Sequence, residues 1–410
     1  MPNQIRVIPT SPYTGIVSGS VIISGARTPI GKMSGALAGF TAMDLGGLVI
    51  AEALRRANAG PDRVDYVLMG HVLQAGQGQI TARQAAVKAG IPMTVPATTV
   101  NKVCLSGLNT IFLADQLIKA GEADIVVAGG MESMTQAPYL LPGARAGYRL
   151  GDGQLVDSLM HDGLWDAFED VAMGAGTEHY LKARPELTRE RQDAFAASSH
   201  ERAASAIKDG RFATEIVAVT VPARRGDPLV VDTDEGVRPG TTPESLGRLR
   251  PAFASDGTIT AGNASQISDG AAAVIVASPA AAERLGVQPL GRVVGYGQVA
   301  GPDPSLLSQP SRATARALER AGLTRADVDL FEFNEAFAAV ALASMDDLGL
   351  SDDVVNVNGG AIALGHPIGM SGTRLALTLL YELGRRGGGL GAAALCGGGG
   401  QGDAIVLRTL

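Results

Sequence analysis

Several residue types that often reveal a protein's class are scarce in this sequence. It contains two cysteines, one tryptophan and five histidines among 410 residues. Two cysteines cannot form the disulfide framework of a small secreted domain. Acidic residues outnumber basic ones, so that the net charge is −7, and no run of Lys and Arg is present. This balance argues against a protein that binds nucleic acid through its surface charge.

Long hydrophobic runs are also absent. No apolar stretch reaches the roughly 18–20 residues that a membrane-spanning helix requires. Residues 1–18 lack the charged and then apolar layout of a signal peptide. We therefore expect a soluble, cytoplasmic protein with an N-terminal tail at 1–18. The 46% of apolar residues and 18% of charged residues are typical of a chain with a large folded core.

Apolar strands and helices alternate after the tail. Strands are expected near 21–24, over 64–70 and over 123–130, and helices over 45–60 and over 108–124. Such alternation predicts an α/β fold with a mostly parallel sheet that helices cover on both faces.

The order of elements is repeated in the C-terminal part. The segment that starts at Ala53, ALRRANAGPDRVDYVLMGHV, aligns without gaps to ALERAGLTRADVDLFEFNEA, which starts at Ala317. The helix after Cys104 corresponds in the same way to 366–389, and the strand 123–130 corresponds to 391–400. Chance similarity of two amphipathic helices is the alternative, but the shared order of elements favours a duplicated domain.

Residues 131–250 interrupt this pattern. The stretch is rich in Gly, Pro and charge, with one clear helix over 188–210, where Thr188 is the expected N-terminal cap and Gly210 the expected C-terminal one. So large an insertion between regular elements is more often functional than idle.

Cys104 and His366 occupy corresponding corners of the two repeats. Cys104, in NKVCLSG, lies at the start of a helix, where the free amides favour a thiolate. His366, in GHPIGMSG, precedes a second helix, whose first residue is expected to be Pro367. Two related halves can bring a thiol and an imidazole to one site, although both residues can also be purely structural.

Two further segments carry polar or reactive groups. Asn334 and Glu335 follow a strand of the second repeat, where parallel sheets present their ligand-binding residues. Cys396 precedes four glycines. The GGGGQG run at 397–402 is followed by another strand rather than by a helix, which excludes a dinucleotide-binding loop. The histidines show no metal-ligand spacing, so no metal site is expected.

Taken together, these motifs resemble the thiolase family. The carriers of the resemblance are GARTPIGK, NKVCLSG, VVAGGMESM, GTITAGNASQISDGAAA, NEAFA, NVNGGAIALGHPIGMSG and CGGGGQGDA, in this order. The resemblance covers the chain from Val21 to the C-terminus. It implies a duplicated, five-layered αβαβα core with an inserted loop domain that holds coenzyme A. The implied division is an N-terminal half at 19–130 completed by 251–285, a loop domain at 131–250 and a C-terminal half at 286–410.

The resemblance also implies an activity, the reversible condensation of two acetyl-CoA to acetoacetyl-CoA and coenzyme A. Cys104 would carry the acetyl group, His366 would help to form its thiolate, and Cys396 would move a proton at the methyl carbon. One oxyanion hole would consist of the Cys104 and Gly398 amides, and the other of His366 and a water held by Asn334. Coenzyme A would enter as a substrate, with no permanently bound cofactor.

The same resemblance implies which residues contact coenzyme A. They are Met173, Arg238, Phe253, Ala261, Ser265 and Phe337. Several relatives have a histidine that contacts the pantetheine arm where this chain has Ala172. A homotetramer built from dimers is expected as the assembly. Three alternatives stay open: a degradative 3-ketoacyl-CoA thiolase, a non-catalytic relative that binds acyl-CoA or lipid, and a cysteine hydrolase.

Overall fold

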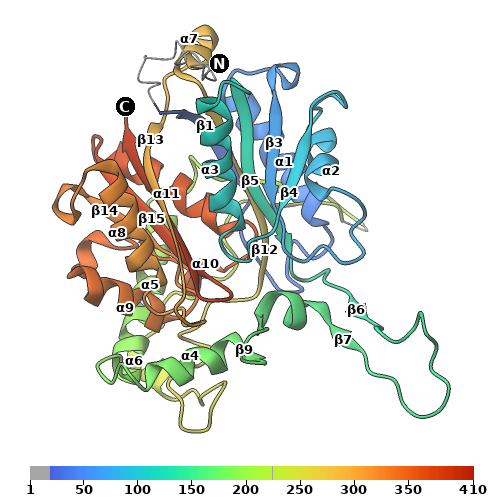
Figure 1. Ribbon diagram of the computed structural model, residues 1–410, viewed down its shortest axis with the longest axis vertical. Helices are drawn as coiled ribbons and strands as arrows, with labels where there is room; N and C mark the ends of the chain where they lie inside the picture. The colour runs from blue at the N-terminus through green and yellow to red at the C-terminus, as the bar shows by residue number, and fades with distance from the viewer. Residues whose placement is uncertain (1–18, 224) are drawn as a thin grey trace, which may run out of the picture.

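A computed structural model describes residues 19–223 and 225–410, so the predicted tail at 1–18 lies outside the described residues. The body consists of five layers (Figure 1). One outer layer contains α1 (Ala42–Arg56) and α2 (Thr81–Lys88), and the other contains α8 (Gln309–Ala321) and α9 (Ala338–Leu348). Two half-sheets lie beneath these layers and enclose α3 (Ser106–Lys119) and α11 (Ser371–Arg385) at the centre. The predicted αβαβα architecture is confirmed.

The two half-sheets form one continuous sheet. Its N-terminal half has the order β4 (Ala97–Val100), β3 (Tyr66–Gly70), β5 (Ile125–Ser133), β12 (Ser268–Ala277) and β1 (Val21–Arg27), and β2 (Gly31–Lys32) pairs with β12. The C-terminal half continues from β1 with β13 (Gly291–Ala300), β16 (Gln401–Thr409), β15 (Leu390–Gly397) and β14 (Leu330–Phe333). The duplication predicted from the sequence is present, because each half places corresponding strands and helices in the same order.

The expectation of a mostly parallel sheet is wrong. Only β3–β4, β3–β5 and β14–β15 pair in parallel, and the remaining neighbours are antiparallel. Two consecutive strands can run parallel only if a crossover connection, usually a helix, joins them. Only the outer strands of each half are joined in this way. The glycine turn after Cys396 instead joins β15 directly to β16 as a hairpin. Helices cover both faces as expected, but over a mixed sheet.

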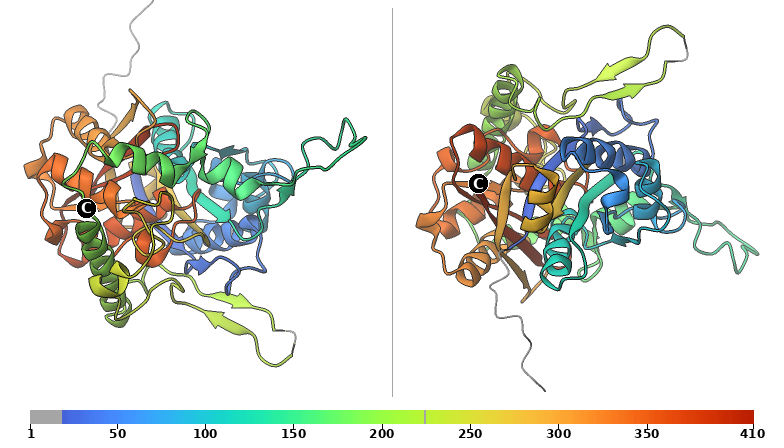
Figure 2. Two further views of the ribbon diagram at one scale, coloured as in Figure 1. Left: turned by 90° about the horizontal axis from the view of Figure 1, so that it is seen from below. Right: turned by 90° about the horizontal axis from the view of Figure 1, so that it is seen from above.

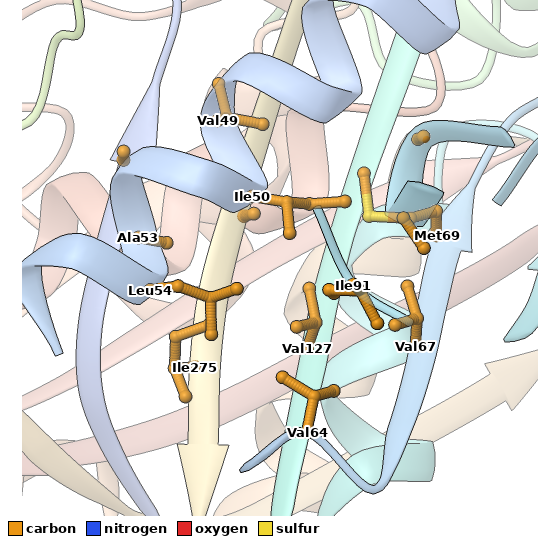
Figure 3. Packing of buried hydrophobic residues seen from close by; sticks show 14 of the residues in the cluster. Val49, Ile50, Ala53, Leu54, Val64, Val67, Met69, Ile91, Val127 and Ile275 are labelled. Carbon is orange, nitrogen blue, oxygen red and sulfur yellow. The ribbon is translucent and has the colours of Figure 1, made fainter. Parts of the chain in front are cut away.

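The outer core of the N-terminal half shows how the helix pattern fixes this arrangement. Val49, Ile50 and Leu54 of α1 point down onto Val127 of β5 and Ile275 of β12 (Figure 3). All five side chains are buried. The capping box formed by Thr41 and Asp44 fixes where α1 begins. Truncation of one such buried aliphatic residue to alanine typically costs about 2–5 kcal/mol of stability.

The long connection from β5 to β12 forms the side of the molecule away from this core. It contains β8 (Trp165–Asp166), β9 (Val171–Ala172), α4 (Met173–Leu181), α5 (Arg189–Lys208) and α6 (Pro243–Gly247). The predicted helix is α5, and Thr188 caps it by accepting a hydrogen bond from the Arg191 amide. The whole connection runs from residue 134 to residue 267, between the ends of β5 and β12.

Two two-stranded arms project from this connection (Figure 2). One is built on β6 (Tyr139–Leu140) and β7 (Val156–Asp157), and the other on β10 (Val219–Val221) and β11 (Leu229–Val231). Within the described ranges, no helix has both the length and the apolar character needed to cross a membrane. The same ranges contain no cluster of three or more His, Cys, Asp or Glu residues suited to a metal ion.

Candidate active site

The predicted site residues converge on one cavity of about 550 Å³. It lies where the two halves meet the long connection between β5 and β12. Among its walls are Cys104, Met173, Arg238, Phe253, Ala261, Ser265, Phe337, His366, Cys396 and Gly398. Asn334 is fully buried behind this wall and contacts His366. Glu335, which the sequence singled out with Asn334, does not line the cavity: its buried carboxylate accepts from the Ser199 hydroxyl, the Asn356 side chain and the Ile362 amide.

Cys104 is presented by a sharp turn before α3. The helix begins at Ser106, and the turn needs a left-handed backbone at Val103, with φ of 51°. A β-branched residue rarely adopts this conformation, so the turn must be held by its surroundings. Ser106 supplies part of this, since its Oγ accepts from the Lys102 amide at 2.8 Å and donates to the Val103 carbonyl at 2.6 Å. The thiol consequently opens onto the cavity, and Cys104 is only half-buried.

His366 is held in one tautomer. The hydroxyl of Ser371 donates to the Pro367 carbonyl at 2.9 Å, so it accepts from the His366 Nδ1–H, at 2.5 Å. The Nε2 atom is then the basic nitrogen, and the side-chain amide of Asn334 donates to it at 3.3 Å. Pro367 is not the first residue of α11, as the sequence suggested, because a turn over 368–370 separates it from the helix start at Ser371.

Asn334 follows directly after β14, at the carboxyl end of a parallel strand pair, as predicted. The backbone amide of Asn334 donates to the Ala394 carbonyl at 3.0 Å, which anchors Asn334 to the strand that carries Cys396. Its side-chain Oδ1 is buried and has no hydrogen-bond partner in the described part of the chain. A buried carbonyl oxygen of this kind is normally satisfied by a water or a ligand, so the site can accept one donor here.

Cys396 lies at the end of β15, opposite Gly402 of β16. It is buried, and it is a free thiol like Cys104. Burial raises the pKa of Cys396, and the neighbouring Cys104 raises it further. Gly398 follows in the hairpin turn and also borders the cavity.

Burial favours the neutral forms of both the Cys104 thiol and the His366 imidazole, through its effect on their pKa values. Burial raises the pKa of Cys104 to about 12, and the carboxyl group of Glu132 adds to this rise. Burial lowers the pKa of His366 to about 3, with a further contribution from the positive charge of Arg374. Burial therefore opposes the expected effect of the helix start, because desolvation raises the pKa of the thiol and disfavours the thiolate. A proton must move as the nucleophile attacks.

The outer part of the cavity is formed by segments that approach from both sides. The Phe253 ring packs edge-on against Phe337, with ring centroids 6.1 Å apart. It also lies against Gly174, where a Cβ atom would come within 2.3 Å of the ring. The Ser265 amide donates to the Ala336 carbonyl at 3.0 Å, which joins the segment around Ser265 to the loop after β14. Ala172, the position at which this chain departs from the family pattern, lies in the wall beside Met173.

Glu132 is a site residue that the sequence did not single out. This buried carboxyl group accepts from the amides of Val72, Leu73 and Gly369, at 2.9–3.2 Å, and so fixes two loops beside Cys104. The loop at Gly369 passes so close to β5 that a Cβ atom on Gly130 would lie 1.8 Å from the Gly369 carbonyl oxygen. Glu132 lies within the GGMESM motif, but only the structure shows the loops that it joins.

Comparison with known proteins agrees with this geometry. The thiolase N-terminal domain model matches residues 20–280, and the thiolase C-terminal domain model matches residues 287–409. A probable acetyl-CoA acetyltransferase of Mycolicibacterium smegmatis is 58% identical over 95% of this chain and 100% of its own length. One of Mycobacterium tuberculosis is 56% identical over 95% of this chain and 99% of its own. An acetyl-CoA acetyltransferase of Cupriavidus necator is 52% identical over 95% and 98%. With two domain models that cover nearly all of its length, this chain belongs to the thiolase family.

Proposed function

We propose that this protein is an acetyl-CoA C-acetyltransferase, which converts two acetyl-CoA into acetoacetyl-CoA and coenzyme A and also catalyses the reverse reaction. The observation that carries the proposal is the convergence of Cys104, His366 and Cys396 on one cavity. The relatives that match nearly the whole chain carry the same activity in their names.

In the first half-reaction, the Cys104 sulfur attacks the thioester carbonyl of acetyl-CoA. His366 Nε2 takes the thiol proton. Because burial favours the neutral forms of both groups, this proton moves while the sulfur attacks and not before. The carbonyl oxygen becomes negative and is stabilised by the Cys104 and Gly398 amides. The C–S bond to coenzyme A breaks, and Cys396 gives its proton to the departing sulfur. The products are acetyl-Cys104, free coenzyme A, an imidazolium and the Cys396 thiolate.

In the second half-reaction, the Cys396 thiolate removes a proton from the methyl carbon of a second acetyl-CoA. The enolate oxygen is stabilised by His366 and by a water bound to the free Oδ1 of Asn334. The carbanion attacks the acetyl group, the bond to Cys104 breaks, and His366 returns its proton to that sulfur. All three groups regain their resting protonation states.

A degradative 3-ketoacyl-CoA thiolase is the second candidate, and one observation favours it. Cys104 packs beside an apolar cluster that includes Met134, Met160, Leu164 and Ile368. Methionine side chains are flexible and can yield to a longer acyl chain. Thiolysis rates for 3-ketoacyl-CoA substrates of four to twelve carbons, on purified protein, decide between the two. We expect the four-carbon substrate to have the highest kcat/KM, and a maximum at eight or more carbons would contradict this.

Arg238 and Ser265 are proposed to contact coenzyme A rather than the reacting atoms. Both lie in the cavity wall, where Arg238 is exposed and Ser265 half-buried, whereas Cys396 is buried. Arg238→Ala and Ser265→Ala should raise KM for acetyl-CoA several-fold and change kcat less than about threefold, because they remove binding shared by the ground and transition states. Steady-state kinetics checks this. An unchanged KM in both variants would refute the assignment.

We further propose a cytoplasmic homotetramer. The arm built on β6 and β7 stands away from the body and exposes Tyr139, Leu150 and Leu155, with Leu150 fully exposed. A monomer rarely presents such residues on a projecting segment, so a second copy is the natural partner. Light scattering at micromolar concentration should give a tetramer. The triple variant Tyr139→Ser, Leu150→Ser, Leu155→Ser should give a dimer with unchanged Tm, and a wild-type monomer would reject the proposal.

A further inference from the structure

Two residues in the motifs around the cysteines have no part in the reaction described above. Lys102 lies two residues before Cys104, and Asp403 lies on β16, opposite Leu395 and beside the pair formed by Cys396 and Gly402. Their side chains form an ion pair, with Nζ and Oδ1 2.7 Å apart. The Asp403 carboxylate is completely buried, and the Lys102 side chain is 21% exposed. The pair thus joins the segments of the two cysteines across the boundary between the halves.

The other polar contacts of the Cys104 turn lie within the turn itself or within the N-terminal half, where the Asn101 side chain donates to the Val72 carbonyl at 3.5 Å. Ser106 binds the backbone of residues 102 and 103, and the Asn101 side chain accepts from the Val103 amide at 3.0 Å. These bonds shape the turn but do not place it relative to the β15–β16 hairpin. Leu105 packs against Gly397, which brings the two segments together without fixing a direction. The ion pair with Asp403 supplies a directional contact.

Lys102 is the closest polar partner of the Asp403 carboxylate among the described residues. Asn109 and Gln298 donate to it only at 3.4 Å, so Lys102 makes its one short bond among the described residues. Burial raises the pKa of Asp403, and the charge of Lys102 opposes this. A buried carboxylate of this kind stays ionised only if its cation stays in place, which ties the position of the Cys104 turn to β16.

We propose that the Lys102–Asp403 pair is a positioning element, which sets the Cys104 sulfur against Cys396 and the Gly398 amide. The inference rests on the proposed function. His366 is held from a different segment, by Ser371 and by the Gln266 carbonyl, so the pair does not control proton removal from Cys104. Asp403 should therefore matter for the acyl-transfer and carbon–carbon steps and not for the reactivity of Cys104 alone.

The test compares Asp403→Asn with the double variant Lys102→Met/Asp403→Leu. Replacing a buried ion pair by apolar side chains of similar size often leaves stability unchanged, so the double variant stays informative if the single one folds poorly. We expect kcat for acetoacetyl-CoA thiolysis to fall about 10–100-fold in both, because small misplacements of reacting groups carry costs of this size. KM and the rate of Cys104 alkylation by iodoacetamide should change less than about twofold.

Asp115→Asn is the matched control. Asp115 is also completely buried and forms an ion pair with a lysine, Lys119, at 2.8 Å, and it accepts from the Ser20 amide and hydroxyl. It lies in the last part of α3 and does not line the cavity. Its kcat should equal that of the wild type. A stable double variant with normal kcat would overturn the inference, and so would an alkylation rate that falls together with kcat. Acetylation of wild-type Cys104 is measured beside these, because its failure would reject the proposed function itself.

Discussion

Cys104→Ala should lower the rates of condensation and thiolysis by at least about 10⁴-fold, because it removes the nucleophile that is proposed to carry the acetyl group. Coenzyme A binding should survive, since the thiol contributes little to a cavity whose outer wall is built by other segments. Isothermal titration should return a Kd for coenzyme A within about threefold of the wild type. Intact-mass analysis after a brief incubation with acetyl-CoA should show one added acetyl group in the wild type and none in the variant.

Peptide mapping must place that acetyl group on Cys104. Cys396 is the internal control, because it is the other free thiol of the same cavity. Its side chain is more deeply buried, and its pKa is raised by burial and by its neighbour. Acetylation of Cys396 in place of Cys104 would contradict the assignment.

The neutral resting pair gives this prediction a pH dependence. Only the thiolate reacts with iodoacetamide, and burial raises the pKa of Cys104 to about 12. Below that pKa the thiolate fraction grows about tenfold for each pH unit. The alkylation rate should therefore keep rising from pH 7 to pH 10. A plateau near pH 7 would show that a thiolate–imidazolium pair exists at rest, as helix position alone suggested.

The sequence predicted the corners of this site well because they rest on the repeat. Cys104 and His366 precede the central helices of the two halves, α3 and α11, and these helices pack against each other. If the two halves are related, the segments before these two helices occupy corresponding positions, so Cys104 and His366 are expected to lie close together. Asn334 was predictable for the same reason, since it ends a strand that corresponds to β3.

What the sequence could not give depends on contacts between distant segments. The strand directions failed because most antiparallel neighbours, such as β1 and β12 or β13 and β16, are far apart in the sequence, and the alternation of strands and helices does not reveal how they pair. The protonation state of Cys104 could not be predicted from the helix start, because burial of the site raises the pKa of the thiol. Lys102 and Asp403 are 301 residues apart, and neither motif indicates that the other is its partner.

Ser371 is an intermediate case. It lies five residues after His366 in the same motif, but the intervening turn decides that its hydroxyl meets Nδ1. The sequence motif contains Ser371, but only the path of the backbone shows that its hydroxyl orients the His366 ring.

Cys396→Ser should separate the two half-reactions. A hydroxyl is a far poorer base than a thiolate but has nearly the same shape, so the fold and coenzyme A binding should be preserved in this buried position. In the proposed mechanism neither the proton acceptor of Cys104, His366, nor the Gly398 amide of the oxyanion hole is changed, so the variant should become acetylated at Cys104. Loading should nevertheless be slower, because the departing coenzyme A loses the proton that Cys396 supplies.

The carbon–carbon step should then fail almost completely. Without a base at residue 396, the methyl carbon of the second acetyl-CoA keeps its proton, and a positioned acid–base group is worth roughly 10²–10⁴-fold in rate. Condensation and thiolysis should fall by at least that factor while intact mass still shows the acetyl-enzyme. Exchange of methyl protons of acetyl-CoA with deuterium from the solvent, followed by mass spectrometry, should be lost in the variant. His366→Ala is the comparison, since it should lose acetylation first. Near-normal condensation by Cys396→Ser, together with lost exchange but retained acetylation in His366→Ala, would mean that His366 and not Cys396 is the base at carbon.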